Sequence, residues 1–349
     1  MSLLEGKRIL VTGGTGSLGQ TLVRRLLTGE MGNIASVTVF SRDEAKQHYM
    51  RLDFMERKTA TDEVIYENSR SKLKFRIGDV RDLSSLITAM RDADIVFHAA
   101  ALKQVPSCEY FPYEAVMTNI GGAENIVRAL RENQLPVEAV VGISTDKACK
   151  PINVMGMTKA LQERILLEAN RDRPDVAINC VRYGNVIASR GSIVPLFVEQ
   201  IKNRQPITIT LPEMTRFLLS LDRAVDTVFE AVRSGRRGCT FIPKVPAAKI
   251  VDVADALMGE TKVEKIFTGI RPGEKVDEIM VSEEECFRTI ESGGYYVILP
   301  VLPELRDIDK ITPALTSEYS SRNDNISVSE LRELLSGASS EIERFMSGN

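Results

Sequence analysis

Residues 8–27 read RILVTGGTGSLGQTLVRRLL, and this stretch determines the fold of the N-terminal part of the chain. Its first five residues predict a short buried strand, and leucines at every fourth position after the glycines predict an amphipathic helix. Between the two elements, Gly13, Gly16 and Gly19 follow the pattern G-x-x-G-x-x-G. A glycine-rich turn from a strand into a helix is typical of a loop that binds a nucleotide diphosphate at the helix N-terminus.

The segments that follow continue the alternation of strand and helix. Apolar runs at residues 36–42, 72–82, 93–101 and 137–145 predict further strands, with helical patterns between them. Strands that alternate with helices indicate an α/β fold with a doubly wound parallel sheet. The polar residues 56–72 predict a solvent-exposed insertion in the crossover after the second strand.

After about residue 185 the alternation weakens, which predicts a smaller α/β substrate-binding domain. We assign residues 1–185 and 217–245 to the dinucleotide-binding domain and residues 186–216 and 246–320 to the substrate-binding domain. Residues 321–349 predict a C-terminal helical tail, in which Ser327 and Glu330 have the spacing of a capping box.

Composition narrows the classes of function. The net charge of −3 argues against a nucleic-acid partner or an anionic membrane partner. Five dispersed cysteines and only two histidines predict free thiols and no metal site. No apolar run is long enough to span a membrane, so we expect a cytoplasmic protein.

Residues of the loop and of the strand ends are the candidates for cofactor binding. Arg42, at the end of the second strand, has the fork geometry to bind a 2′-phosphate, which favours NADP over NAD. A solvated Arg42 is the alternative, and Asp43 would then serve the ribose of NAD. The candidates from these segments are Gly13, Thr15, Gly16, Ser17, Leu18, Gly19, Ser41, Arg42, Asp43, Asp79, Val80, Ala99, Ala100 and Ala101.

The segment at residues 142–159, GISTDKACKPINVMGMTK, contains an incomplete Tyr-x-x-x-Lys pattern. Lys159 is present, but Met155 occupies the position of the tyrosine, and a thioether cannot accept a proton. The adjacent Asp146 and Lys147 offer an acid and a base in the same loop. A charge-paired surface turn is the alternative interpretation of these two residues.

Several motifs in order resemble one known family. They are TGGTGSLG, FSRDE, GDVRD, AAALKQVP, TNIGG, STDKA, PINVMGMTK, RYGNVIASRGS, MTRFLLSLDRA and GIRPGEK. Over about residues 5–335 the chain resembles the soluble, inverting UDP-N-acetylglucosamine 4,6-dehydratases of the extended short-chain dehydrogenase/reductase superfamily. One branch of that family carries methionine at the position of Met155. The resemblance implies a Rossmann domain, UDP-N-acetylglucosamine as substrate, a homo-oligomer and inversion at C5.

The resemblance also implies roles for individual residues. Asp146 would protonate the departing 6-hydroxyl group, Lys147 would remove the C5 proton, and Thr145 would bind the 4-hydroxyl group. Lys159 would hold the nicotinamide ribose, and Met155 would only pack against the sugar or the cofactor. As a base, Lys147 needs a pKa roughly 3 units below its reference value of about 10.4.

The remaining candidates also follow from the resemblance, and other functions stay open. Cofactor contacts are expected from Lys103, Asn119 and Tyr183. Substrate contacts are expected from Lys103, Asn185, Arg190, Arg216, Arg271 and Glu274. A UDP-sugar 4-epimerase, a reductase and a non-catalytic NADP-binding regulator are the alternatives. The helical segments at 114–133 and 155–170 are candidates for the oligomer interface.

Overall fold

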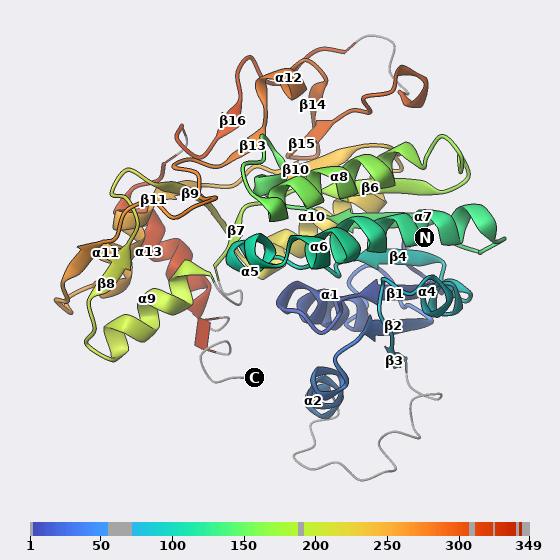
Figure 1. The fold of residues 1–349 in the computed structure, drawn as a ribbon, viewed down its shortest axis with the longest axis horizontal. Coiled ribbons are helices and arrows are strands. Elements are labelled where there is room, and N and C mark those ends of the chain that lie inside the picture. The colour runs from blue at the N-terminus through green and yellow to red at the C-terminus, as the bar shows by residue number, and fades with distance from the viewer. Residues whose placement is uncertain are drawn as a thin grey trace.

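A computed structural model describes residues 3–54, 72–187, 192–306, 311–323, 325–339 and 342–343. The predicted insertion at residues 56–72 lies outside the described residues except for Lys72, and Arg190 lies outside them as well. The described chain forms a large α/β part and a smaller lobe at one end of it (Figure 1).

A nine-stranded sheet is the centre of the larger part. The strand order is β14 (Thr289–Ser292), β15 (Tyr295–Ile298), β10 (Thr240–Pro243), β6 (Ala177–Val181), β5 (Ala139–Ile143), β4 (Ile95–His98), β1 (Arg8–Thr12), β2 (Ser36–Ser41) and β3 (Leu73–Ile77). The strands β1 to β6 and β10 run parallel, whereas β15 and β14 add an antiparallel edge. The order reverses between β1 and β4, where ligands bind in such sheets. The predicted doubly wound parallel sheet is confirmed.

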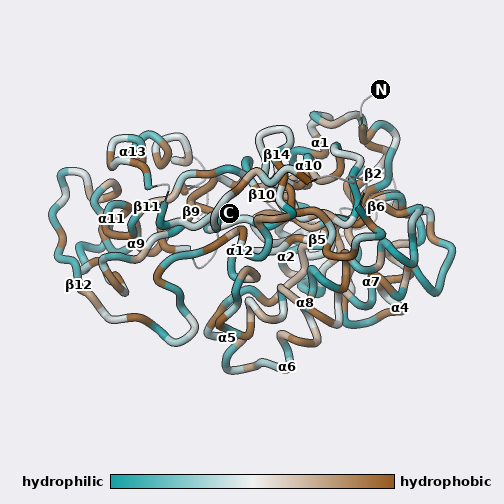
Figure 2. The backbone as a smooth tube through the Cα atoms, turned by 90° about the horizontal axis from the view of Figure 1, so that it is seen from above, coloured by the Kyte–Doolittle hydropathy of each residue, from teal (hydrophilic) through white to brown (hydrophobic). Residues whose placement is uncertain are grey.

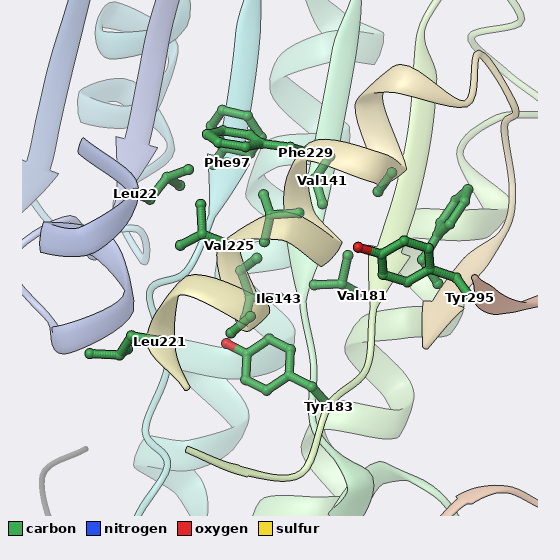
Figure 3. Close-up of a cluster of buried hydrophobic side chains, with 14 of the residues drawn as sticks. Leu22, Phe97, Val141, Ile143, Val181, Tyr183, Leu221, Val225, Phe229 and Tyr295 are labelled. Carbon is green, nitrogen blue, oxygen red and sulfur yellow. The ribbon is translucent and has the colours of Figure 1, made fainter. Parts of the chain in front are cut away.

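Helices cover both faces of this sheet and bury separate apolar layers. On one face, α1 (Ser17–Leu27) packs with α10 (Leu221–Arg233). On the other face, α7 (Gly121–Glu132) packs between α4 (Leu83–Met90) and α8 (Val154–Glu168). Figure 3 shows the first layer, where Leu22 of α1 and Phe229 of α10 meet Phe97 and Val141 of the sheet.

The smaller lobe has an apolar core of its own. It contains β8 (Ile207–Ile209) paired with β12 (Lys265–Phe267), and a sheet of β7 (Asn185–Val186), β9 (Thr215–Leu219) and β11 (Ala247–Lys249). Figures 1 and 2 both show α9 (Ile193–Lys202), α11 (Ile250–Met258) and α13 (Val328–Gly337) gathered at this end of the molecule. The other elements are α2 (Glu44–Phe54), α5 (Val105–Tyr110), α6 (Pro112–Ala115), η2 (Val116–Ile120), η3 (Asp146–Ala148), β13 (Ile279–Val281), α12 (Glu283–Cys286), η4 (Pro303–Leu305) and β16 (Tyr319–Ser320).

Two segments belong to a different part of the molecule from the one to which the predicted domain boundaries assign them. β14 and β15 fall in the range predicted for the substrate-binding domain, yet they extend the central sheet because buried residues such as Val297 pack into its core. α13 belongs to the predicted tail, yet Leu331 and Leu335 pack with α11 in the core of the smaller lobe. Its capping box is present, since Ser327 Oγ accepts from the N–H of Glu330 and the Glu330 carboxylate accepts from the N–H of Ser327.

Candidate active site

The glycine-rich loop has the close contacts that its sequence predicts. Gly13 has a φ of +69°, and a Cβ atom there would lie 2.6 Å from the backbone nitrogen of Ala100. A Cβ atom at Gly19 would lie 2.5 Å from the Cα of Gly14, so the helix approaches the loop too closely for any side chain. The first contact places the end of β1 against the segment after β4, and the second places the start of α1 against the loop, as in a dinucleotide-binding loop.

The start of α1 leaves its backbone donors open to a ligand. Gly16 is the N-cap, and no side chain of the described residues caps the helix. The first turn carries no acidic residue. The unsatisfied N–H groups and the positive end of the helix dipole therefore favour an anionic group at this site.

A cavity of about 270 Å³ lies at the carboxyl ends of the central strands. It brings together 14 of the residues predicted to function: Gly13, Gly16, Ser17, Leu18, Gly19, Ala99, Ala101, Lys103, Thr145, Lys147, Met155, Lys159, Tyr183 and Asn185. Its apolar wall includes Ile143, Tyr183 and Leu221, which Figure 3 shows next to the apolar layer under α10. The glycine-rich loop, the segment that contains Thr145 and Lys147, and helix α8 thus line the same cavity.

A chain of short polar contacts connects the cavity wall to a buried carboxylate. Thr145 Oγ1 donates to Asp146 Oδ1 over 2.8 Å, and Lys147 Nζ donates to the same oxygen over 3.1 Å. Thr145 and Lys147 line the cavity, whereas Asp146 is fully buried behind them. Asp146 Oδ2 is buried without a hydrogen-bond partner among the described residues. Asp146 is therefore connected to the cavity through its two sequence neighbours.

Lys147 has a second carboxylate next to it, which the sequence did not reveal. Glu278 Oε1 lies 3.1 Å from Lys147 Nζ, and Asn185 Oδ1 accepts from the same nitrogen over 3.4 Å. Burial lowers the pKa of Lys147, but the Asp146 and Glu278 carboxylates outweigh burial and raise the pKa overall. The structure therefore does not show the lowered pKa that a lysine base requires.

Lys159 lies on α8 with its amine inside the protein. Its Nζ donates to the carbonyl oxygen of Ile143 over 2.5 Å and to Gln162 Oε1 over 2.6 Å. Burial lowers its pKa to about 8. Met155, one turn earlier, is buried against Cys108 and Ala115 and also lines the cavity. The methionine therefore packs within the protein and borders the cavity, and its contact with the sugar or the cofactor stays a prediction.

The end of β2 offers Arg42 rather than an acid. Asp43 Oδ1 accepts from the N–H of Lys46 at the start of α2, and its Oδ2 lies 2.6 Å from Lys46 Nζ. Ser41 Oγ accepts from Gln47 Nε2 over 3.1 Å. The Arg42 side chain is 55% exposed, with its guanidinium 3.8 Å from Asp79 Oδ2. The Asp43 carboxylate is thus occupied by its own helix.

Other predicted cofactor residues support the loops from outside the cavity lining. Asn119 lies in the π-helical turn η2, where its amide bonds the backbone of Leu102 and Thr158 Oγ1. Val80 is buried against Gly122, and its carbonyl oxygen accepts from Asn125. The residues of this group that do not line the cavity are Thr15, Ser41, Arg42, Asp43, Asp79, Val80, Ala100 and Asn119.

Three predicted substrate residues lie away from the cavity lining. The Arg216 guanidinium is buried and donates to the carbonyl oxygens of Thr215, Lys275 and Val276, so backbone acceptors occupy the donors expected to bind a diphosphate. Arg271 is exposed on a turn, where its backbone N–H donates to Glu274 Oε2. In this region the structure differs from the expectation, because the sequence does not show which acceptors an arginine meets.

Sequence reasoning missed several polar residues that the fold brings to the site, among them Ser144, Gln162 and Glu278. Ser144 lines the cavity, and its Oγ is buried without a hydrogen-bond partner among the described residues. Gln162 lies three residues after Lys159 on α8, a helical spacing that places the two side chains together. No signal of that kind exists for Glu278, which lies far along the chain from Lys147.

Comparisons with known proteins identify the family of this chain. A family model described as polysaccharide biosynthesis protein matches residues 9–300. The chain belongs to this family. A UDP-glucose 4-epimerase of Rickettsia bellii (strain OSU 85-389) is 44% identical over 345 residues, which cover 94% of this chain and 95% of the relative. The UDP-glucose 4-epimerase of Rickettsia felis is 44% identical over 343 residues, with the same coverage of both chains.

Solved structures of other proteins share the fold. The crystal structure of Pen from Bacillus thuringiensis superposes with a TM-score of 0.85 at 32% identity, over 96% of this chain and 98% of that one. DesIV, a dTDP-glucose 4,6-dehydratase from Streptomyces venezuelae, has a TM-score of 0.64 at 19% identity, over 77% and 86% of the two chains. The Rossmann-type fold of the extended short-chain dehydrogenases/reductases is therefore shown.

Two further features concern the described residues alone. In that part of the chain, no helix combines the length and the apolar character that crossing a bilayer requires. The same residues hold no group of three or more His, Cys, Asp or Glu side chains arranged to bind a metal ion.

Proposed function

We propose that this protein is an NADP-dependent UDP-N-acetylglucosamine 4,6-dehydratase. The observation that carries the proposal is the connected set Thr145, Asp146 and Lys147 beside the cavity, together with Met155 in place of a tyrosine. Loss of water across C5 and C6 needs a base for the C5 proton and an acid for the 6-hydroxyl group. Epimerisation at C4 needs neither of these two groups.

The loop residues fit a nicotinamide dinucleotide. A side chain at Gly16 would meet only Gly13 O at 3.4 Å, so the protein leaves the space beside the uncapped α1 N-terminus open for a diphosphate. Arg42 would hold the 2′-phosphate of NADP, a role supported by its exposure and by the engagement of Asp43 with α2. When bound, the cofactor supplies a reversible hydride acceptor for the sugar. Protein groups must supply everything else, namely binding, orientation and proton transfer.

Thr145 and Asp146 provide a route for the proton of the 4-hydroxyl group. Met155 cannot accept it, but Thr145 lines the cavity and already donates its hydroxyl proton to Asp146 Oδ1. A 4-hydroxyl group bound to Thr145 Oγ1 would pass its proton to that oxygen as Thr145 passes its own to Asp146. The buried carboxylate thereby becomes the acid that later protonates the departing 6-hydroxyl group.

Lys147 becomes a base by losing its proton to solvent once Asp146 has taken the proton of the 4-hydroxyl group. Protonation of Asp146 removes one of the two carboxylate charges that raise the pKa of Lys147, so this pKa falls. For a reference lysine at pH 7 the loss of the proton costs about 5 kcal/mol, from a difference of roughly 3.4 units between pKa and pH. A turnover of about 10 per second corresponds to a barrier of about 16 kcal/mol, so this cost fits within the reaction. The neutral amine then takes the C5 proton.

UDP-glucose 4-epimerase is the second candidate, because curated relatives that are 44% identical carry that name. A 4-epimerase exchanges one proton with the 4-oxygen and turns the ketone over between two hydride transfers. Thr145 and Asp146 could perform that exchange without Met155. Lys147, held between two carboxylates, would have no task in such a reaction.

The direct test incubates purified protein with UDP-N-acetylglucosamine, and separately with UDP-glucose, without added cofactor. We expect a product of UDP-N-acetylglucosamine that has lost one water by mass spectrometry and carries a 4-ketone. Lys147→Met should abolish this product, whereas the matched Lys150→Met, which removes the ammonium group paired with Glu318, should not. Formation of UDP-galactose or UDP-N-acetylgalactosamine with no loss of water would establish the epimerase instead.

We also propose that C5 is inverted, which gives the 4-keto-6-deoxy-L-arabino sugar for a surface polysaccharide or glycan. Lys147 approaches C5 from one side, and loss of water opens the planar C5 to a donor on the other side. Turnover in deuterated water followed by proton NMR distinguishes the two outcomes through the ring coupling constants. A D-xylo product labelled at C5 would exclude inversion and leave the dehydratase assignment intact.

A further inference from the structure

A buried acid from the C-terminal third of the chain reaches the catalytic loop. Glu278 directly precedes β13, and its side chain is 2% exposed. The Lys147 amine lies 3.1 Å from Glu278 Oε1 and 3.1 Å from Asp146 Oδ1. The amine is therefore held between two buried carboxylates, one from its own loop and one from a distant segment.

Two hydrogen bonds to Ser321 hold the backbone of Glu278 in place. Its N–H donates to Ser321 Oγ over 2.9 Å, and its carbonyl oxygen accepts from the N–H of Ser321 over 2.8 Å. β13, which begins at the next residue, pairs with β16. A carboxylate on such a fixed backbone has little freedom to follow a moving partner, so it can define where that partner lies.

Other charged and polar groups face the same cluster. Arg216 Nε lies 3.9 Å from Glu278 Oε1, and Lys275 Nζ lies 3.9 Å from Glu278 Oε2. Asn185 Oδ1 accepts from Lys147 Nζ over 3.4 Å. With two further cations at this range, the charge of Glu278 stays compensated when Lys147 gives up its proton.

We propose that Glu278 is a positioning residue of this active site, which holds the Lys147 amine at the cavity wall opposite Asp146. The part that Lys147 plays in catalysis rests on the proposed function, whereas its contact with Glu278 does not. Glu278 and Asp146 together raise the pKa of Lys147, against burial and Arg216, which lower it. Without the Glu278 charge, burial and Arg216 gain weight and the pKa of Lys147 falls.

The test measures this pKa directly in the full-length protein. Competitive labelling with acetic anhydride across a pH series, read by mass spectrometry of the Lys147 peptide, reports the fraction of neutral amine. Glu278→Gln should lower the pKa of Lys147 by about one unit or more, a tenfold gain of neutral amine at a fixed pH below the pKa. Asp277→Asn is the matched control, because that carboxylate bonds Thr215 and Arg322, and it should leave Lys147 unchanged.

A second measurement separates positioning from a general loss of structure. The pH dependence of kcat with UDP-N-acetylglucosamine should move to lower pH in Glu278→Gln by the same amount as the labelling curve. Glu278→Asp, which keeps the charge but shortens the reach, should retain a raised Lys147 pKa and serves if the Gln variant fails to fold. An unchanged Lys147 labelling curve in both variants would overturn the proposal. Absence of any turnover in the parent protein would instead refute the dehydratase assignment, and labelling would still decide the role of Glu278.

Discussion

Gly13 allows a sharp test of the cofactor loop, because the chain contains a matched glycine elsewhere. Gly13 and Gly6 have nearly the same backbone conformation, with φ of +69° and +70°. A Cβ atom at Gly13 would lie 2.6 Å from Ala100 N and 2.8 Å from the carbonyl carbon of Ala99, whereas one at Gly6 would meet no atom within 4 Å. Alanine at the two positions therefore differs only in the clash.

The expected magnitudes follow from these contacts. The left-handed conformation costs an L-residue about 1–2 kcal/mol, which Gly6→Ala should lose in unfolding free energy. Gly13→Ala adds an overpacking cost of about 1–3 kcal/mol, because the nearest neighbours are backbone atoms that cannot rotate away, for a total of about 2–5 kcal/mol. Since Gly13 lines the cavity, a shifted loop should also release the cofactor.

Urea unfolding and the amount of dinucleotide that copurifies with each variant measure the two effects. Gly6→Ala should keep the cofactor content of the parent protein, and Gly13→Ala should lose most of it. Equal stability of the two variants with unchanged cofactor content would refute the reasoning, because the close approach of Gly13 to Ala100 would then have no consequence.

Three further predictions concern other parts of the molecule. Mass spectrometry of the nucleotide released from purified protein should find mainly NADP, and Arg42→Ala should shift the content toward NAD; mainly NAD in the parent would assign the ribose to Asp43. Met155→Leu should keep activity within about tenfold, since a lost packing contact costs on the order of 1 kcal/mol, and a fall of several orders of magnitude would reveal an unidentified role. Met157 and Leu161 leave 48% and 52% of their surfaces exposed on α8, so light scattering should find a homo-oligomer that Leu161→Glu weakens; a monomeric parent would contradict this.

The fold could be predicted where the signal is local. The spacing of the glycines and the alternation of short apolar runs with helical patterns are properties of neighbouring residues, and they were sufficient to predict β1, α1 and the parallel strands that follow. β14 and β15 have only four residues each, which is too few to show whether they join the large sheet or the smaller lobe. The sheet in which a short strand pairs depends on tertiary contacts that periodicity does not contain.

In the candidate site, too, local patterns could be predicted from the sequence and long-range contacts could not. The cofactor loop follows β1 and the segment around Lys147 follows β5; the two come together because the carboxyl ends of these parallel strands, with β4 between them, lie at the same edge of the sheet. Arg216 was expected at a diphosphate, but its guanidinium meets backbone carbonyl oxygens. Glu278 was not predicted at all, because nothing in its neighbours indicates that it reaches Lys147. Side-chain partners across long stretches of sequence are set by packing, and one sequence does not display them.

The relatives are named UDP-glucose 4-epimerases, whereas the reaction proposed here is a 4,6-dehydration. The two reactions have much of their chemistry in common. Both reactions begin with transfer of a hydride from C4 to the cofactor, and both need the cofactor loop. Sequence identity along the whole chain is therefore expected between enzymes of the two kinds. What separates them is whether the protein can then move protons at C5 and at the 6-hydroxyl group. In the reaction that we propose, Asp146 and Lys147 move these protons, and Glu278 contacts Lys147 from behind. If the protein epimerised UDP-glucose, and if neither Asp146→Asn nor Lys147→Met changed that activity, the contacts between these residues would have to be structural. If instead both variants stop the loss of water from UDP-N-acetylglucosamine with the cofactor still bound, the reaction is determined by this cluster and not by the fold.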